Sequence, residues 1–145
     1  MQDTLPIHFA PLQGYTEAIY RNAHDAFFGG VDTYYTPFVR LEKGNFRRRD
    51  VRGIEPENNG VPHLIPQLIA SSAEKAEVIL SLFIEKGYQE VDINLGCPFP
   101  LLVKRHNGSG ILPYPEEVKA LLSIVTRYPQ ISFSVKMRLG WEQPD

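Results

Sequence analysis

Short apolar runs alternate with segments of helical periodicity along most of this 145-residue chain, and this alternation constrains the fold more than any other feature. Runs rich in β-branched and aromatic residues are typical of strands, whereas apolar residues that recur every three or four positions are typical of amphipathic helices. Strands are predicted at residues 7–12, 33–39, 63–69, 90–94 and 131–139. Because helices are predicted between most of them, we expect parallel strands joined by right-handed crossovers, which is an α/β fold.

Three of the predicted helices have clear boundaries. The first begins after Thr16, which is a predicted N-cap. The second follows a capping box formed by Ser71 and Glu74. The third begins near Pro115 and ends before Pro129. Each helix has an apolar stripe. The stripes are Ile19, Ala23, Ala26 and Phe27; Ala76, Ile79, Leu80, Phe83 and Ile84; and Val118, Leu121, Leu122 and Val125.

Residues 41–62 lack a regular period, and one short helix is predicted within them, around residues 46–51. They carry the arginine run 47–49, which neighbouring acidic residues balance, so a solvated loop is favoured over a contact with nucleic acid. The formal net charge of −2 gives the chain no global attraction for a polyanion. Composition therefore allows a nucleic-acid partner without indicating one.

The chain has the composition of a globular domain, with 43% hydrophobic residues and one cysteine. A single cysteine excludes a disulfide within the chain, and the cytoplasm is the expected compartment. No apolar run approaches the length needed to cross a bilayer, so we expect no insertion into a membrane.

Residues able to do chemistry occur where successive predicted strands end. They are Pro11, Leu12, Gln67, Asn94, Cys97, Lys136 and Arg138. Because the carboxyl ends of parallel strands form one face of a (β/α) barrel, we expect these residues to converge there. The sequence has no P-loop, no Rossmann glycine motif and no paired metal-ligand cysteines, which argues against ATP, dinucleotide-fold and zinc chemistry.

The strongest functional signal is the segment from Asn94 to Cys97, which places an amide and the only thiol together where a strand runs out into a loop. A lone cysteine is more often a small buried apolar residue than a catalyst, so the thiol alone leaves both interpretations open. In the last predicted strand, Lys136 and Arg138 share one face. If the apolar residues of that strand pack against helices, both cations point into the barrel.

Five motifs, in this order, resemble those of the tRNA-dihydrouridine synthases, which are flavin enzymes of the (β/α)8-barrel type. They are Ala10-Pro11-Leu12-Gln13-Gly14-Tyr15-Thr16, Pro66-Gln67, Asp92-Ile93-Asn94-Leu95-Gly96-Cys97-Pro98, Gly108-Ser109-Gly110-Ile111-Leu112 and Val135-Lys136-Met137-Arg138-Leu139-Gly140. The resemblance implies a TIM barrel that is truncated after about five parallel strands, because a complete barrel needs about 250 residues.

The resemblance implies reduction of uridines in tRNA, with FMN carrying hydride from NADPH to uracil C6 and Cys97 donating a proton to C5. A cysteine thiol is mostly protonated at pH 7 and can act as a general acid. Asn94 matches the family position that contacts uracil, and Lys136 matches the lysine that stabilises the reduced flavin near its N1 and O2. The remaining matches are Ala10, Pro11, Leu12 and Gln67 around the isoalloxazine ring, and Arg138 as a cation on the substrate or phosphate side.

For several of these residues, a purely structural or surface role also stays open. Lys136 can lie in solvent, Gln67 can be a plain strand-end residue, and Arg138 can serve only an ion pair. In the loop of residues 98–110, which could cover the site, Lys104, Arg105 and His106 either touch RNA phosphates or belong to a mobile surface loop.

In the family, three further strands and a helical tRNA-binding domain follow, and both are expected to be absent from residues 1–145, which form a partial catalytic domain. An unclosed sheet exposes its edges, so self-association is predicted. Two alternatives to a tRNA enzyme also stay open. One is a flavin-dependent barrel dehydrogenase that acts on a free pyrimidine, and the other is an inactive fragment that only binds or assembles.

Overall fold

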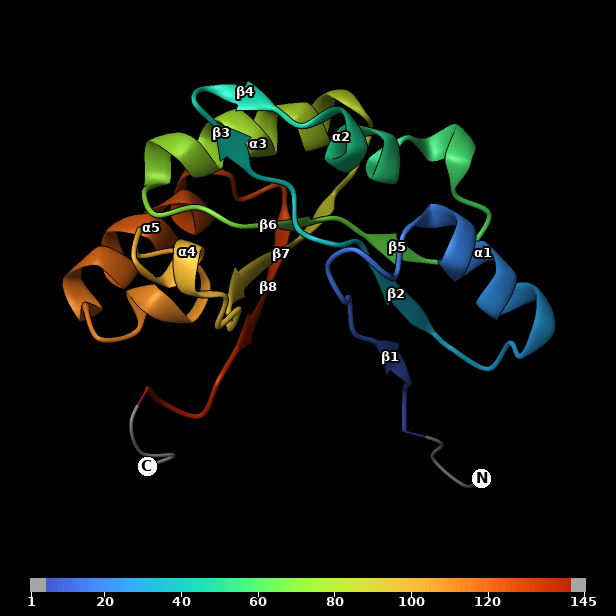
Figure 1. The fold of residues 1–145 in the computed structure, drawn as a ribbon. Helices are drawn as coiled ribbons and strands as arrows, with labels where there is room; N and C mark the ends of the chain where they lie inside the picture. Colours follow the sequence, from blue (N-terminus) through green and yellow to red (C-terminus); the bar gives the residue numbers. More distant parts are fainter. Residues whose placement is uncertain (1–4, 142–145) are drawn as a thin grey trace.

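The computed structural model describes residues 5–141, in which strands and helices alternate along the chain (Figure 1). The strands are β1 (His8–Phe9), β2 (Thr33–Tyr35), β3 (Leu41–Glu42), β4 (Asn45–Phe46), β5 (Leu64–Ile65), β6 (Gln67–Leu68), β7 (Glu90–Leu95) and β8 (Ser132–Met137). The helices are α1 (Ala18–Phe27), α2 (Arg48–Ile54), α3 (Ala73–Glu85), α4 (Pro100–Val103) and α5 (Pro115–Arg127), with 3₁₀ turns η1 (Pro56–Asn58) and η2 (Gly108–Ile111). The predicted domain spans residues 1–145, of which 1–4 and 142–145 lie outside the described residues.

The long-range strand pairs are parallel. In one sheet β2 lies between β1 and β5, and in the other β7 lies between β6 and β8. Pro66 separates β5 from β6, because proline has no N–H to donate to a neighbouring strand, and a parallel bridge between Val39 and Leu68 continues the pairing beyond it. The α/β class with parallel strands is confirmed. Within residues 5–141 the strands form an open arrangement and no closed barrel.

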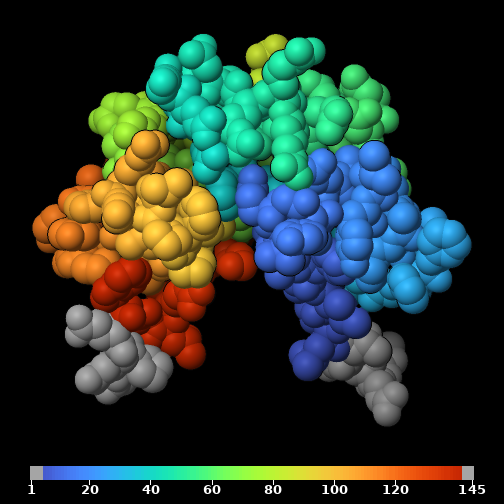
Figure 2. Space-filling model, in the orientation of Figure 1, coloured from blue at the N-terminus to red at the C-terminus, as the bar shows by residue number. Residues whose placement is uncertain are grey.

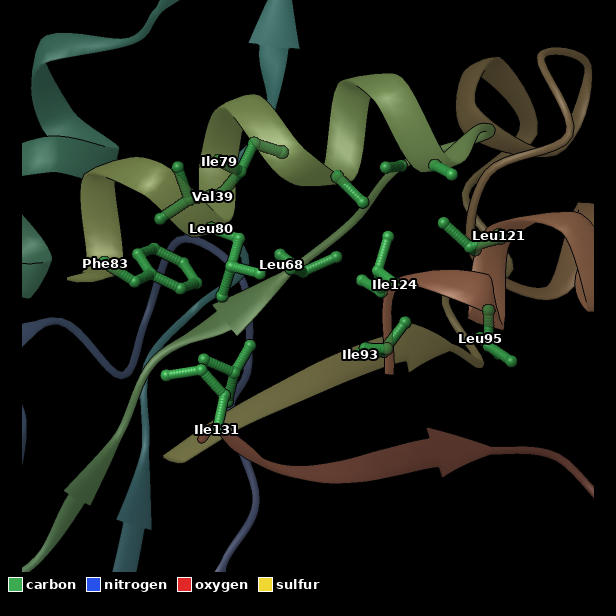
Figure 3. Close-up of a cluster of buried hydrophobic side chains, with 14 of the residues drawn as sticks. Val39, Leu68, Ile79, Leu80, Phe83, Ile93, Leu95, Leu121, Ile124 and Ile131 are labelled. Carbon is green, nitrogen blue, oxygen red and sulfur yellow. The ribbon is translucent and has the colours of Figure 1, made fainter. Parts of the chain in front are cut away.

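Helices α3 and α5 cover one face of the β6-β7-β8 sheet and enclose the main core (Figure 3). The largest of its fully buried side chains come from the sheet, the two helices, α2 and η2: Leu68, Ile93, Ile79, Leu80, Phe83, Leu121, Ile124, Ile54 and Ile111. Burying one such side chain stabilises a fold by about 1.5–3 kcal/mol. The stripe predicted for α3 is confirmed except at its end, where Ile84 remains 38% exposed.

Helix α1 packs through a different face from the one that its apolar stripe predicted. Ile19 and Phe27 are both 84% exposed, whereas Ala18 and Arg21 are buried. The stripe prediction is wrong for this helix because the guanidinium of Arg21, and not an apolar side chain, points inward and donates hydrogen bonds to surrounding oxygens.

Two predicted helix caps are displaced by one residue. The N-cap of α1 is Glu17, while the Thr16 hydroxyl accepts a hydrogen bond from Leu12 N at 2.9 Å and so closes the preceding turn. The N-cap of α3 is Ser72, whose Oγ accepts from Lys75 N at 3.4 Å. The serine at position 71, predicted as the cap, lies one residue before it. For α3 a neighbouring serine of equal capping ability takes the position, whereas Glu17 occupies the N-cap of α1 without a side-chain capping hydrogen bond.

The irregular part of the sequence contains a hairpin that was not predicted. Strands β3 and β4 pair antiparallel around Lys43 and Gly44, whose φ angles are +50° and +79°. Positive φ at both central residues is typical of the tight turn that joins two strands of right-handed twist. The short helix predicted at residues 46–51 begins later, as α2.

The strands form an arch with the helices on its outer side, and β1 and β8 lie at its two ends (Figure 1). Figure 2 shows the N-terminal and C-terminal parts of the chain on opposite sides of an open recess. Among residues 5–141, β1 and β8 each pair on one side only. Self-association through these edges stays a prediction.

Candidate active site

The recess inside the arch brings together residues from both ends of the strand order. A cavity of about 270 Å³ lies there. Its lining comes from the N-terminal strands and from β7 and β8: His8, Ala10, Pro11, Tyr35, Asp92, Ser134, Val135 and Lys136. Three residues predicted for one site, Ala10, Pro11 and Lys136, therefore line the same cavity although they are far apart in the sequence.

The other predicted residues are not part of the lining of this cavity. Leu12 is 59% exposed and lies beyond the lining. Gln67 is fully buried, behind Asp92. Arg138 donates from Nε to the carbonyl oxygen of Gly96 at 2.8 Å and so braces the loop that follows β7.

A chain of hydrogen bonds runs from Asp92 to the backbone of Cys97. Asp92 Oδ2 accepts from Gln67 Nε2 at 2.6 Å, and Gln67 Oε1 accepts from Asn94 Nδ2 at 2.8 Å. Asn94 Oδ1 then accepts from Gly96 N at 3.0 Å and from Cys97 N at 2.9 Å. Because a carboxylate only accepts, Asp92 determines which way the amide of Gln67 points, and Gln67 in turn determines the orientation of Asn94.

Asp92 and Ser134 were missed by the sequence interpretation. Ser134 Oγ donates to Asp92 Oδ1 at 2.7 Å, so both carboxylate oxygens are paired. Burial raises the pKa of Asp92, and the hydrogen bonds from Ser134 and Gln67 and the charge of Lys136 oppose that shift. The available signal was the period of two along β7, which places Asp92 on the same face as Asn94.

Cys97 is half-buried at the end of β7, where it packs against Phe38, Ile69 and Leu102. Its carbonyl oxygen accepts hydrogen bonds from Ser109 N and Ser109 Oγ, both at 3.0 Å. The η2 turn therefore holds the cysteine backbone from one side, while Asn94 holds it from the other.

Two glycines allow η2 to approach this closely. Gly108 has a φ of +59°, and a Cβ there would lie 2.6 Å from the Cys97 carbonyl oxygen. A Cβ at Gly110 would lie 2.4 Å from the Val103 carbonyl oxygen. A side chain at Gly108 would push η2 away from the cysteine, and one at Gly110 would push it away from α4, so the Gly-Ser-Gly motif lets this turn pack against both.

Lys136 lies beside the cysteine segment from the neighbouring strand. It pairs in register with Asn94, and a Cβ added at Gly96 would lie 3.6 Å from Lys136 Nζ. The expectation that the apolar residues of the last strand pack against helices holds for Phe133, which contacts the main core, but not for Met137, which is 59% exposed. The Asn94 amide, the backbone of Cys97 and the Lys136 side chain thus lie near one another at the carboxyl ends of β7 and β8.

Neither a metal-binding cluster nor a membrane-spanning helix is found among the described residues. Residues 5–141 contain no group of three or more His, Cys, Asp or Glu side chains placed to hold a metal ion. None of the helices described is both long enough and apolar enough to cross a bilayer.

Parallel strands with polar side chains converging at their carboxyl ends define an α/β protein with its site at that edge of the sheet. The family model for dihydrouridine synthase (Dus) matches residues 8–145. The chain therefore belongs to the dihydrouridine synthase family.

Individual relatives agree with this family. The chain is 29% identical over 139 residues to the probable tRNA-dihydrouridine synthase 1 of Synechocystis sp., a match that covers 92% of this chain and 37% of that protein. It is 33% identical over 76 residues to tRNA-dihydrouridine synthase B of Klebsiella pneumoniae, covering 52% of this chain and 24% of that protein. The chain thus spans well under half of the length of the relatives it matches.

Proposed function

We propose that this chain forms part of an FMN-dependent, NADPH-linked enzyme that reduces the C5=C6 bond of uridines in tRNA, built on a (β/α)8 barrel to which the described strands contribute. The observation that carries the proposal is the hydrogen-bond chain from Asp92 to the backbone of Cys97, with Lys136 Nζ close to the adjacent Gly96. Family membership and the names of the relatives supply the substrate class.

The lining of the recess supports a flavin ring as the ligand in this proposal. Ala10, Pro11 and Val135 provide apolar wall, and Lys136 provides a cation. A cation near the flavin N1 and O2 stabilises the reduced ring. When bound, FMN supplies the hydride that NADPH has delivered to it. In this proposal Lys136 and the Ala10-Pro11-Leu12 segment hold the cofactor, with Gln67 orienting the polar residues behind it.

In the same proposal Cys97 donates the proton to uracil C5. The Cys97 residue is half-buried, and its backbone is hydrogen-bonded to Asn94 and Ser109, which fixes the point from which the side chain extends. The second N–H of Asn94 Nδ2 can donate to a uracil carbonyl oxygen, because Gln67 Oε1 takes only one of the two. Arg138 acts through the carbonyl of Gly96 and braces this loop.

The test is the variant Cys97→Ala, with Ser81→Ala on the exposed face of α3 as a matched control. We expect Cys97→Ala to keep FMN binding, measured by flavin fluorescence, and to lower the rate of dihydrouridine formation in tRNA by roughly 10²–10⁴-fold, the usual contribution of a general acid. Mass spectrometry of the tRNA reports the product. Unchanged product formation would refute the role of Cys97, and turnover of free uracil in place of tRNA would refute the substrate class.

A further inference from the structure

We propose that a second cavity, which borders the apolar cluster of Phe38, Ile69 and Leu102 against which Cys97 packs, binds the phosphodiester backbone of the RNA next to the target uridine. The cavity has a volume of about 390 Å³ and lies between the β3–β4 hairpin, the first turn of α3 and the α4 segment. We call it the basic groove and define it by its charged and apolar lining: Arg40, Glu42, Lys43, Ile69, Lys75, Leu102 and Arg105.

The groove lining is positively charged, whereas the chain as a whole has a small negative net charge. The whole sequence has 15 basic and 17 acidic residues, yet the groove lining has four cations and one carboxylate. That carboxylate, Glu42, lies 2.5 Å from the Arg40 guanidinium and 3.7 Å from Arg47 Nε, so cations already neutralise it. An anion is therefore the ligand that this lining fits.

Three of the cations are available to such a ligand. In the part of the chain that the structure describes, Lys43, Lys75 and Arg105 form no ion pair with a carboxylate. Lys75 Nζ contacts only a neutral partner, Ser71 Oγ, at 3.0 Å. The first turn of α3 adds nothing to this argument, because its amides are already capped by Ser72 and Glu74.

The three cations come from separate segments. Lys43 lies in the hairpin turn, Lys75 in α3 and Arg105 after α4. Proteins that bind single-stranded nucleic acid track its backbone with a positively charged groove, and cations from three segments give this cavity that character.

The groove also adjoins the proposed catalytic thiol. Ile69 and Leu102 line the groove and belong to the small apolar cluster against which Cys97 packs. One layer of apolar side chains therefore separates the cations from the cysteine. The identity of the anion rests on the proposed function: if a uridine lies against Cys97, the phosphates of its flanking nucleotides are the anions within reach of the groove.

The experiment compares tRNA binding by the unchanged chain and by Lys75→Gln, Arg105→Gln and the double variant. Lys119→Gln, at an exposed position on α5 outside the groove, removes the same charge and serves as the matched control. Filter retention of labelled tRNA is measured over a range of NaCl concentrations. We expect the slope of log K against log[NaCl] to become shallower by about 1 in each groove variant and by about 2 in the double variant, with no change in the control.

Three outcomes would overturn the groove. They are slopes that do not change in the groove variants, an equal change in Lys119→Gln, and a chain that retains no tRNA even at low salt. Binding of NADPH or inorganic phosphate that is lost in Lys75→Gln, together with tRNA slopes that do not change, would show that small phosphates are the ligand and would also overturn it. FMN titration of the same proteins distinguishes the two proposals. If the tRNA-binding slopes change as expected but FMN does not bind, the result counts against the proposed flavin chemistry and not against the groove.

Discussion

The two sides of the arch are held together by different forces. The C-terminal side has a six-residue pairing between β7 and β8 and an apolar core under α3 and α5, in which Leu80, Phe83 and Ile93 are fully buried. On the N-terminal side β1 pairs over two residues, and α1 exposes its apolar residues Ile19 and Phe27.

The N-terminal side depends instead on Arg21. Its fully buried guanidinium donates to Thr16 O at 2.7 Å, to Gly53 O at 2.8 Å and to Asn59 Oδ1 at 2.6 Å. Burial lowers the pKa of Arg21 to about 10, so the charge is disfavoured there and these hydrogen bonds offset part of that cost. The difference teaches that apolar periodicity located the packed face of α3 but not that of α1, where a polar side chain organises the contact.

The largest expected effect is in the apolar core. We expect Phe83→Ala to lower the free energy of unfolding by about 3–5 kcal/mol, because it removes a fully buried ring and leaves a cavity. Phe27→Ala in α1 is the matched control, and it should change the stability by less than about 0.5 kcal/mol. Urea denaturation measures both. A large loss at Phe27 would contradict the contrast between the two sides.

The next effect tests the polar contact of α1. We expect Arg21→Met to destabilise the protein by roughly 2–3 kcal/mol, because buried oxygens at Thr16 and Gly53 lose a charged donor. The control is Arg52→Met, since the Arg52 side chain is 71% exposed, and its effect should be close to zero. If Arg21→Met were as stable as the parent protein, apolar contacts alone would hold α1.

Asp92 provides a further test of the comparison between the two sides of the arch, because it is a buried carboxyl group in β7 on the C-terminal side, where apolar packing dominates. Its pKa is raised by burial in the folded state, so between the unfolded value of about 3.9 and the raised value the native state holds the proton more tightly. Stability that this group contributes at low pH is therefore lost as pH rises through that window, by about 1.4 kcal/mol for each unit of the shift.

Asp92→Asn removes this titration. We expect the variant to become more stable relative to the parent as pH rises from 4 to 7, and urea denaturation at each pH measures this. The altered hydrogen bond to Gln67 adds a difference in the free energy of unfolding that does not change with pH. Glu57→Gln, at an exposed position, should give a curve parallel to the parent. Parallel curves for Asp92→Asn as well would show that the carboxyl is not coupled to folding.

The smallest effect distinguishes the two serines before α3. We expect Ser72→Ala to cost about 1 kcal/mol and to speed hydrogen exchange in the first turn of the helix, because its hydroxyl caps Lys75 N. Ser71→Ala should cost less than about 0.5 kcal/mol, since Ser71 Oγ contacts only the exposed Lys75 side chain. The reverse order would restore the capping box that the sequence predicted.

Most residues of the candidate site were proposed from strand ends along the sequence, and Ala10 was added from the family resemblance. Ala10, Pro11 and Lys136 line one cavity, and Asn94 and Cys97 are joined by a hydrogen bond. Leu12 lies outside the lining, because the turn closed by Thr16 carries it away from the recess. Asp92 and Ser134 were missed because a short polar residue inside a strand gives no signal of its partner until the register of β7 and β8 is known.

By itself, the order of residues determined the α/β class, the positions of α3 and α5, the family and the strand-end residues, since these depend on periodicity and motifs within short stretches of chain. Only the tertiary structure decided that Arg21 is the inward face of α1, that Asp92 orients Gln67 and Asn94, and that cations from three segments surround one groove. Each of these depends on contacts between residues distant in the sequence, and local propensity carries no information about such contacts.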